Sequence, residues 1–394
     1  MAENRFAKRM WHASSNAIRE ILKVTERPDV ISFAGGLPAP SSFPVETINR
    51  IAGEILTADG CRCLQYGTTE GYWPLREAIA NWVKVKGIET SPDQVLVLSG
   101  SQQGLDLMGK AFLDAGDRVI VEEPAYLAAL QIFRSYEADL IPVKGDEEGY
   151  DPEALEAALK EHQPKFIYLV STFHNPTGIT YSVERRQKVA ELAAKYDCYV
   201  IEDDPYGDLR YSGERVPALQ TFNPERVVYL GSFSKIIAPG LRTGYAVVNN
   251  PEIRQKLVIG KQGADVHTSN LSQRIVQRFL AEGLLPGHIE TICQDYKAKR
   301  DLMLESLEEH FPAGAKWVKP DGGLFLWVTL PEDISAIDVF PRAVEEKVAF
   351  VPGAYFFAQG GGENTLRLNF SNATFEQLQT GCARLGKVLK EFLD

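Results

Sequence analysis

Residues 226–235 read Arg-Val-Val-Tyr-Leu-Gly-Ser-Phe-Ser-Lys, and a Pro-Gly-Leu-Arg sequence occupies residues 239–242. The apolar run from Arg226 to Gly231 is typical of a strand that is buried on both faces of a parallel sheet. The polar residues that follow it begin a turn at the carboxyl end of that strand. Open α/β sheets bind their ligands at this edge. The stretch therefore predicts an α/β fold with a site that includes Lys235.

Lys235 is the most informative of these side chains. Its amine can form a covalent bond with an aldehyde cofactor, and Ser232 and Arg242 can hold a phosphate group beside it. The alternative is a solvated lysine on a loop, where most lysines lie. Because Ser-x-x-Lys alone is a weak signal, the interpretation depends on partners elsewhere in the sequence.

A carboxylate ends a second predicted strand, which runs from Cys198 to Asp203. An ionised carboxylate at the edge of the sheet can keep a pyridine nitrogen protonated. Glu202 and Asp204 flank Asp203, and alternation along the strand places both on the opposite face from it. Spacing alone does not choose among the three carboxylates, and a solvated acidic turn is the other interpretation.

Two uncharged hydrogen-bonding side chains follow strands that end at the same edge. Asn175 comes after the predicted strand Phe166 to Ser171, and Tyr206 comes three residues after Asp203. An amide and a phenol suit a phenolic oxygen whose charge changes during a reaction. The alternative for Asn175 is an ordinary Asn-Pro-x-Gly turn between a strand and a helix.

The loop at residues 99–104, Ser-Gly-Ser-Gln-Gln-Gly, joins a predicted strand at 94–98 to a predicted helix at 104–112. Backbone N–H groups at a helix N-terminus bind anions, so Ser101 and Gln102 are candidates for a phosphate site. The loop lacks the Gly-Lys-Ser/Thr of a P-loop. Tyr126, which follows another strand, can lie on the face of a ring, and its alternative is a core tyrosine.

These parts meet the demands of pyridoxal phosphate (PLP), which needs a lysine, an anion, phenolate donors, a phosphate site and an aromatic face. The sequence resembles the class I/II aminotransferases of the PLP fold-type I superfamily. It is closest to the branch of 2-aminoadipate and kynurenine aminotransferases. The resemblance runs from residues 27–38 to residues 364–370, and eight motifs occur in order along the chain.

The resemblance chooses among the open alternatives for the cofactor site. The family's Asp-x-x-Tyr pattern falls on Asp203 and Tyr206, which implies that Asp203 is the partner of the pyridine nitrogen. The Asn-Pro-x-Gly pattern falls on Asn175. The lysine motif of the family falls on Ser232, Ser234, Lys235 and Arg242.

The resemblance also implies the substrate contacts. Arg367 matches an arginine that binds the substrate α-carboxylate, a task that suits the two parallel donors of a guanidinium. Gly36 matches a residue whose backbone lies against the substrate. Tyr66 matches a tyrosine that reaches the phosphate of the neighbouring subunit, which implies a homodimer. Tyr126 takes the ring-stacking position, where some relatives carry Trp or Phe.

The implied architecture is a large PLP-binding domain at residues 41–285, with a mostly parallel seven-stranded sheet, and a small α+β domain at residues 1–40 and 286–394. The alternation of strands and helices between residues 47 and 262 agrees with this division. A long helical region is expected from Leu271 to Glu309. The small domain has predicted strands at 323–330, 349–351 and 365–370, and predicted helices at 337–346 and 375–392.

The composition narrows the class of protein. Hydrophobic residues make up 44% and charged residues 24% of the chain, as in a folded globular protein. The formal charge of −11 argues against nonspecific binding to nucleic acid or anionic membranes. No apolar run is long enough to span a membrane, and Met1 to Trp11 does not resemble a signal peptide. Five scattered cysteines predict reduced thiols, no metal site and a cytoplasmic location.

The resemblance implies ping-pong transfer of the amino group of an L-amino acid to a 2-oxo acid, and 2-oxoglutarate is the expected acceptor. In the resembled branch a mobile N-terminal helix covers the side-chain pocket, and here it corresponds to Ser14 to Val24. Arg19 on this segment is the candidate for binding a distal carboxylate, which predicts a broad range of acidic, aromatic and branched-chain substrates. The alternative is a solvated arginine beside Glu20.

Two other functions are compatible with PLP binding. One is a different PLP reaction, such as β-elimination from cysteine conjugates or a synthase step. The other is the PLP-binding domain of a transcription regulator. The regulator is less favoured, because the motif at Phe33 to Gly36 begins only 33 residues into the sequence, which is too few for a DNA-binding domain before it.

Overall fold

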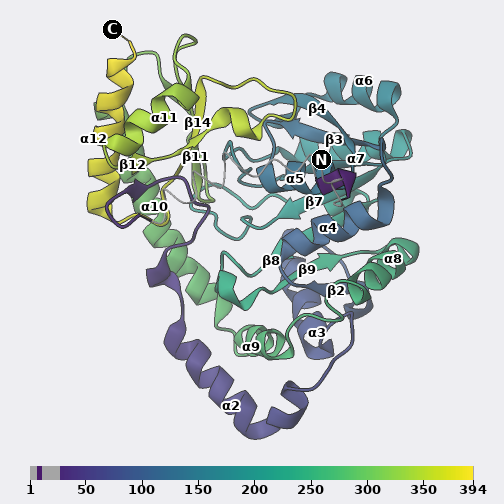
Figure 1. Cartoon of the computed structure of the whole chain (residues 1–394). Coiled ribbons are helices and arrows are strands. Elements are labelled where there is room, and N and C mark those ends of the chain that lie inside the picture. The colour runs from purple at the N-terminus through teal and green to yellow at the C-terminus, as the bar shows by residue number, and fades with distance from the viewer. Residues whose placement is uncertain (1–6, 11–26, 394) are drawn as a thin grey trace, which may run out of the picture.

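The computed structural model describes residues 7–10 and 27–393 of the 394-residue chain. Figure 1 shows a larger part built around one sheet, and a smaller lobe that contains the C-terminus. Among the helices in the described part of the chain, none combines the length and apolar character that crossing a membrane requires.

The larger part is built on an eight-stranded sheet in the order β2-β9-β8-β7-β6-β3-β4-β5. Its strands are β2 (Val95–Leu98), β3 (Arg118–Glu123), β4 (Asp139–Asp146), β5 (Gly149–Tyr150), β6 (Phe166–Leu169), β7 (Tyr199–Asp204), β8 (Val227–Ser232) and β9 (Gly244–Val247). The strands β3, β4, β6, β7 and β8 pair in parallel, whereas β9 is antiparallel to both of its neighbours. The predicted α/β fold with a mostly parallel sheet is confirmed. The eighth strand, β5, has two residues and pairs with β4 across a tight turn, so it is too short to leave an apolar pattern in the sequence.

Helices cover both faces of this sheet, as they must, because β6 and β8 are buried along their whole length. These helices are α4 (Ser101–Phe112), α5 (Leu127–Ser135), α6 (Pro152–His162), α7 (Val183–Lys195) and α8 (Pro251–Gln262). Local sequence explains where several of them begin. The side chains of Asp151, Ser182 and Asn250 accept hydrogen bonds from first-turn N–H groups of α6, α7 and α8.

The parallel pairing of β6, β7 and β8 places their carboxyl ends at one edge of the sheet. Asn175 follows β6, Asp203 lies near the end of β7 and Lys235 follows β8. The topology therefore brings together three side chains that are up to 60 residues apart in the sequence.

The smaller lobe contains a four-stranded antiparallel sheet in the order β10-β11-β14-β13. Its strands are β10 (Lys316–Trp317), β11 (Phe325–Thr329), β13 (Val351–Pro352) and β14 (Thr365–Asn369), and its helices are α10 (Leu285–His310), α11 (Ala336–Glu345) and α12 (Phe375–Glu391). A separate pair joins β1 (Ile31–Ser32) to β12 (Val348–Ala349) in parallel. The predicted strand at 349–351 is thus two short strands in different sheets. The N-terminal segment contacts the smaller lobe through β1, although the domain boundaries themselves stay a prediction.

The remaining helices, α2 (Val45–Cys63), α3 (Trp73–Trp82) and α9 (Asn270–Ala281), pack against one another at one end of the molecule (Figure 1). The helical region expected at 271–309 is divided between α9 and α10. Gly283 separates the two helices and has a φ of +68°, a left-handed conformation that ends a helix and suits glycine. Short 3₁₀ turns complete the fold: η1 (Lys8–Met10), η2 (Pro40–Ser42), η3 (Val83–Lys86), η4 (Pro92–Gln94), η5 (Leu219–Phe222), η6 (Pro239–Leu241) and η7 (Gly353–Phe356).

Candidate active site

A cavity of about 400 Å³ lies at the carboxyl ends of the central strands. This volume is in the range of small-molecule sites. Twelve of the residues singled out in the sequence line it: Gly36, Ser101, Gln102, Tyr126, Asn175, Asp203, Tyr206, Ser232, Ser234, Lys235, Arg242 and Arg367. Because Arg367 lies on β14 of the smaller lobe, both parts of the molecule form the cavity.

Lys235 lies in the turn three residues after β8. Its Nζ donates a hydrogen bond to the backbone carbonyl of Gly36 at 2.8 Å. Burial, helped by the positive charges of Arg242 and Arg367, lowers the pKa of Lys235 to about 8. Near pH 7, the uncharged fraction of this amine is therefore larger than that of an ordinary lysine. The uncharged amine is the form that acts as a nucleophile.

The three carboxylates at the end of β7 point to opposite sides of the sheet, as alternation predicts. Asp203 lines the cavity. Its Oδ2 accepts a hydrogen bond from the Tyr168 hydroxyl at 3.3 Å, and its Oδ1 is buried with no partner among the described residues. Burial raises the pKa of Asp203 to about 7. A cation placed against Oδ1 would favour the ionised carboxylate and lower this pKa.

The two flanking carboxylates are paired with cations away from the cavity. Glu202 lies 3.5 Å from the guanidinium of Arg186 and also accepts hydrogen bonds from backbone N–H groups. Asp204 lies 2.8 Å from the Nζ of Lys86 and accepts a hydrogen bond from the Tyr229 hydroxyl at 2.6 Å. Both carboxylates are thus already satisfied, which leaves Asp203 as the one of the three with an unpaired oxygen.

A hydrogen-bonded chain joins the smaller lobe to the loop after β7. Arg367 Nη1 donates to Asn175 Oδ1 at 2.7 Å, and Asn175 Nδ2 donates to the Tyr206 hydroxyl at 3.3 Å. The guanidinium of Arg367 lies over the ring of Phe325 at 4.2 Å, and its Nε is buried with no partner within the described ranges. Its Nη2 also donates to the carbonyl of Ala34 at 2.6 Å, so the arginine is held in place while its Nε–H stays unpaired.

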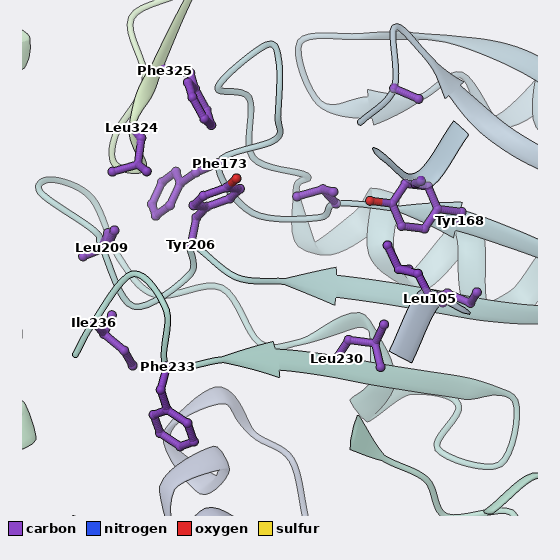
Figure 2. Packing of buried hydrophobic residues seen from close by; sticks show 14 of the residues in the cluster. Leu105, Tyr168, Phe173, Tyr206, Leu209, Leu230, Phe233, Ile236, Leu324 and Phe325 are labelled. Carbon is purple, nitrogen blue, oxygen red and sulfur yellow. The ribbon is translucent and has the colours of Figure 1, made fainter. Parts of the chain in front are cut away.

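Aromatic packing fixes the Tyr206 ring. Figure 2 shows it beside Phe173, with Phe325 of the smaller lobe nearby. Tyr206 and Phe325 meet edge to face with ring centroids 5.7 Å apart. Burial raises the pKa of the Tyr206 hydroxyl above its ordinary value, so the group stays protonated and can donate.

The first turn of α4 forms another wall. Its N-cap is Gly100 with a φ of +89°, no side chain caps the helix and the first turn carries no acidic residue. The N–H groups of Ser101 and Gln102 are therefore free to bind an anion, whereas that of Gln103 donates to the carbonyl of Gly100 at 3.1 Å. Arg242 Nη2 donates to the carbonyl of Ser99 at 3.1 Å. A Cβ at position 100 would lie 2.5 Å from Arg242 Nη2, so glycine is what allows this arginine to approach the loop.

Tyr66, which was also singled out in the sequence, does not line this cavity. Tyr66 is 79% exposed and lines a different hollow of about 360 Å³ beside Asn270 and Arg274. Arg19 lies outside the described residues. The predicted role of Tyr66 involves a neighbouring subunit, so its position away from the cavity of its own chain does not conflict with that role.

The sequence reasoning missed part of the wall. The additional lining residues include Ala34, Leu127, Ala128, Gln131, Val351 and Phe356. Leu127 and Ala128 follow Tyr126 directly and Gln131 lies one helical turn after them, so helical spacing was the signal that could have found them. Ala34 comes from a segment far in the sequence from Val351 and Phe356, and none of the three carries a local signal.

The cavity fits PLP by the chemistry of its walls. Asp203 Oδ1 is a buried acceptor that lacks a donor, and the protonated nitrogen of a pyridine ring is such a donor. The uncapped end of α4 and Arg242 suit a phosphate group, and the Lys235 amine suits an aldehyde. Tyr126 also lines the cavity, and burial raises the pKa of its hydroxyl to about 12.

Comparison with known proteins shows the family of this chain. The family model "Aminotransferase class I and II" matches residues 30–385. An aromatic-amino-acid aminotransferase of Thermococcus litoralis is 45% identical over 99% of this chain and 95% of its own length. A 2-aminoadipate transaminase of Thermus thermophilus is 44% identical, with 98% and 97% covered. The crystal structure of a Pyrococcus horikoshii kynurenine aminotransferase, solved with PMP, superposes with a TM-score of 0.95 at 45% identity, covering 99% of this chain and 98% of that one. The chain therefore belongs to the class I and II aminotransferases, and it is a transaminase that uses pyridoxal phosphate.

Proposed function

We propose that the protein is an aminotransferase of broad specificity that moves the amino group of an L-amino acid to a 2-oxo acid, with 2-oxoglutarate as the usual acceptor. The proposed donors are 2-aminoadipate, glutamate, and aromatic and branched-chain amino acids. The relatives named for aromatic amino acids and for 2-aminoadipate support this range, since both are about equally similar to this chain. The observation that carries the proposal is the meeting of Lys235, Asp203 and Arg367 in one cavity.

Each wall of the cavity has a proposed part in holding PLP. The Lys235 amine would hold the aldehyde, and the Asp203 carboxylate would hold the protonated ring nitrogen. Asn175 and Tyr206 would donate to the phenolic oxygen. The remaining group, which would hold the phosphate and the face of the ring, comprises Ser101, Gln102, Tyr126, Ser232, Ser234 and Arg242. When bound, PLP draws electrons from the Cα–H bond of an amino acid and so makes its proton acidic.

The remaining steps belong to side chains of this protein. Arg367 and Asn175 would bind the α-carboxylate, Arg367 through its free Nε and one shared nitrogen. This anchoring orients the Cα–H bond toward the face from which Lys235 approaches. The Nζ of Lys235, with its lowered pKa, would act as a base when it takes the proton from Cα. It would then act as an acid when it returns the proton in the next step.

Arg19 is proposed to bind the distal carboxylate of acidic substrates. The described turn η1 packs against α5, which forms part of the cavity wall, and the segment that carries Arg19 follows η1 in the chain. Replacing Arg19 with Ala should lower kcat/KM for 2-aminoadipate far more than for leucine or phenylalanine. Equal losses for all three substrates would contradict this role.

We also propose that the protein is a cytoplasmic homodimer in which Tyr66 completes the site of the neighbouring subunit. The exposure of Tyr66 together with the nearby Leu64, which is 73% exposed, supports an interface at this surface. The five free cysteines support a reducing compartment.

An absorbance titration tests the proposed function. The PLP-loaded protein should show a visible cofactor band that decreases on addition of an amino donor and returns on addition of 2-oxoglutarate. A band that no amino acid changes would contradict the proposal. Release of ammonia without any need for a 2-oxo acid would favour an elimination reaction at the same site instead.

A further inference from the structure

One polar side chain of the cavity has no part in the functions described above. The other polar side chains that line the cavity have proposed roles in binding PLP or the substrate α-carboxylate. The exception is Gln131, which lines the same cavity from helix α5. It is half-buried, and within the described residues its side-chain amide makes no hydrogen bond.

The position of Gln131 follows from the direction of α5. This helix begins directly after Tyr126, and Leu127, Ala128 and Gln131 together line the cavity. With a rise of 1.5 Å per residue, position 131 lies about 7.5 Å along the helix from Tyr126. Gln131 is therefore on the part of the wall that is remote from the proposed ring-stacking position.

The surface next to it is apolar. Leu127 packs against a buried cluster that contains Ala34, Val351 and Phe356, and all four residues line the cavity. A substrate side chain that extends over this surface would lose water along its methylene groups. Its end would then reach the only polar side chain that this stretch of α5 offers to the cavity.

We propose that Gln131 sets the preference of the enzyme for amino acids with a distal carboxylate, because its Nε2 donates a hydrogen bond to that carboxylate. The inference rests on the proposed aminotransferase function and names one residue that selects the substrate. Gln131 would share this carboxylate with Arg19, and it differs from Arg19 in lying on α5 and in carrying no charge.

The uncharged amide also explains how apolar substrates share the site. A buried charge without a partner is costly, whereas a half-buried amide keeps some contact with water when leucine or phenylalanine binds. Gln131 therefore adds to the binding of acidic substrates without excluding apolar ones.

The test compares kcat/KM for 2-aminoadipate with kcat/KM for leucine in single variants. Gln131→Glu keeps the size of the side chain but replaces the donor with a negative charge, and Gln131→Met removes the donor without adding a charge. Hydrogen bonds to charged groups account for roughly ten- to a hundredfold in affinity. We expect the ratio of 2-aminoadipate to leucine to fall by about that factor in Gln131→Glu and by less in Gln131→Met.

The matched control is Gln187→Glu, which makes the same change on the exposed face of α7, outside the cavity, and should leave the ratio unchanged. A ratio in both Gln131 variants that equals that of the wild type would overturn the role of Gln131. Absence of any response to amino acids in the wild type would instead overturn the aminotransferase function. If Gln131→Glu does not bind PLP, Gln131→Met alone decides the question.

Discussion

At the scale of single residues, burial determines the chemistry of Lys235. Its pKa is lowered to about 8 first by burial and then by the charges of Arg242 and Arg367. Because the amine is neutral above this pKa, covalent capture of PLP by the apo-protein should speed up with rising pH and level off above about pH 8. Stopped-flow absorbance at a series of pH values measures this directly. A midpoint near the ordinary lysine value of 10.5 would contradict the environment described for Lys235.

Asp203 differs from its two neighbours in having an unpaired oxygen. Replacing Asp203 with Asn keeps the shape but removes the negative charge that would hold a ring proton. We expect kcat to fall by about a hundredfold or more, in line with the loss of one preorganised charge-stabilising group. The half-reaction with a good donor, followed in single turnovers, measures the change. A variant that retains most of the wild-type rate would show that another carboxylate serves the ring nitrogen.

At the scale of elements, β7 ends in three consecutive buried carboxylates that have different tasks. Alternation along a strand predicts that Asp203 faces away from Glu202 and Asp204, and the structure agrees. Which face looks into the cavity could not be predicted, because Lys86, the partner of Asp204, comes 118 residues earlier in the sequence. Pairing of this kind depends on tertiary packing and leaves no local pattern.

Lys86 offers a stability test of this arrangement. It is buried and lies 2.8 Å from Asp204 and 3.2 Å from Asp208. Lys86→Met would leave the buried carboxylate of Asp204 without its paired ammonium group, whereas Asp208 would keep Arg215 at 3.2 Å. The free energy of unfolding at neutral pH should therefore fall by about 3–5 kcal/mol. Urea unfolding measures it, with Lys84→Met on the same turn as the exposed control that should change stability by less than about 0.5 kcal/mol.

The pH dependence supplies a second outcome for Lys86→Met. Without the ammonium group, the pKa of Asp204 in the folded protein should rise above its value in the unfolded chain. Asp204 would then destabilise the fold at pH values where its carboxyl is ionised. The loss should therefore shrink as the pH falls and the carboxyl becomes protonated. A loss that is constant with pH would point to packing of the lysine stem rather than to charge.

At the scale of the whole molecule, the order of strands and helices was predictable because the apolar runs and the polar turns after them repeat along the chain. The sequence missed β5, which is too short for a pattern, and the division of the long helical region at Gly283. It also missed the apolar wall of the cavity, since Ala34 lies far in the sequence from Val351 and Phe356 and meets them only in the folded chain.

The proposed dimer makes a prediction about Tyr66. Tyr66→Phe should weaken PLP binding by roughly ten- to a hundredfold, as expected for a lost hydrogen bond to a charged group. In a mixed dimer with a Lys235→Ala subunit, the Tyr66→Phe subunit keeps its own Lys235 and would receive an intact Tyr66 from its partner. One site of each mixed dimer should then regain wild-type PLP affinity. No recovery would mean that Tyr66 does not act across an interface.

The most direct test of the account concerns the amine that holds the cofactor. Sodium borohydride reduction of the PLP-loaded protein makes the covalent link permanent, and peptide mapping by mass spectrometry then locates it. The account predicts a phosphopyridoxyl group on Lys235 and on no other lysine. A label on a different lysine, or no label in a protein that binds PLP, would contradict it.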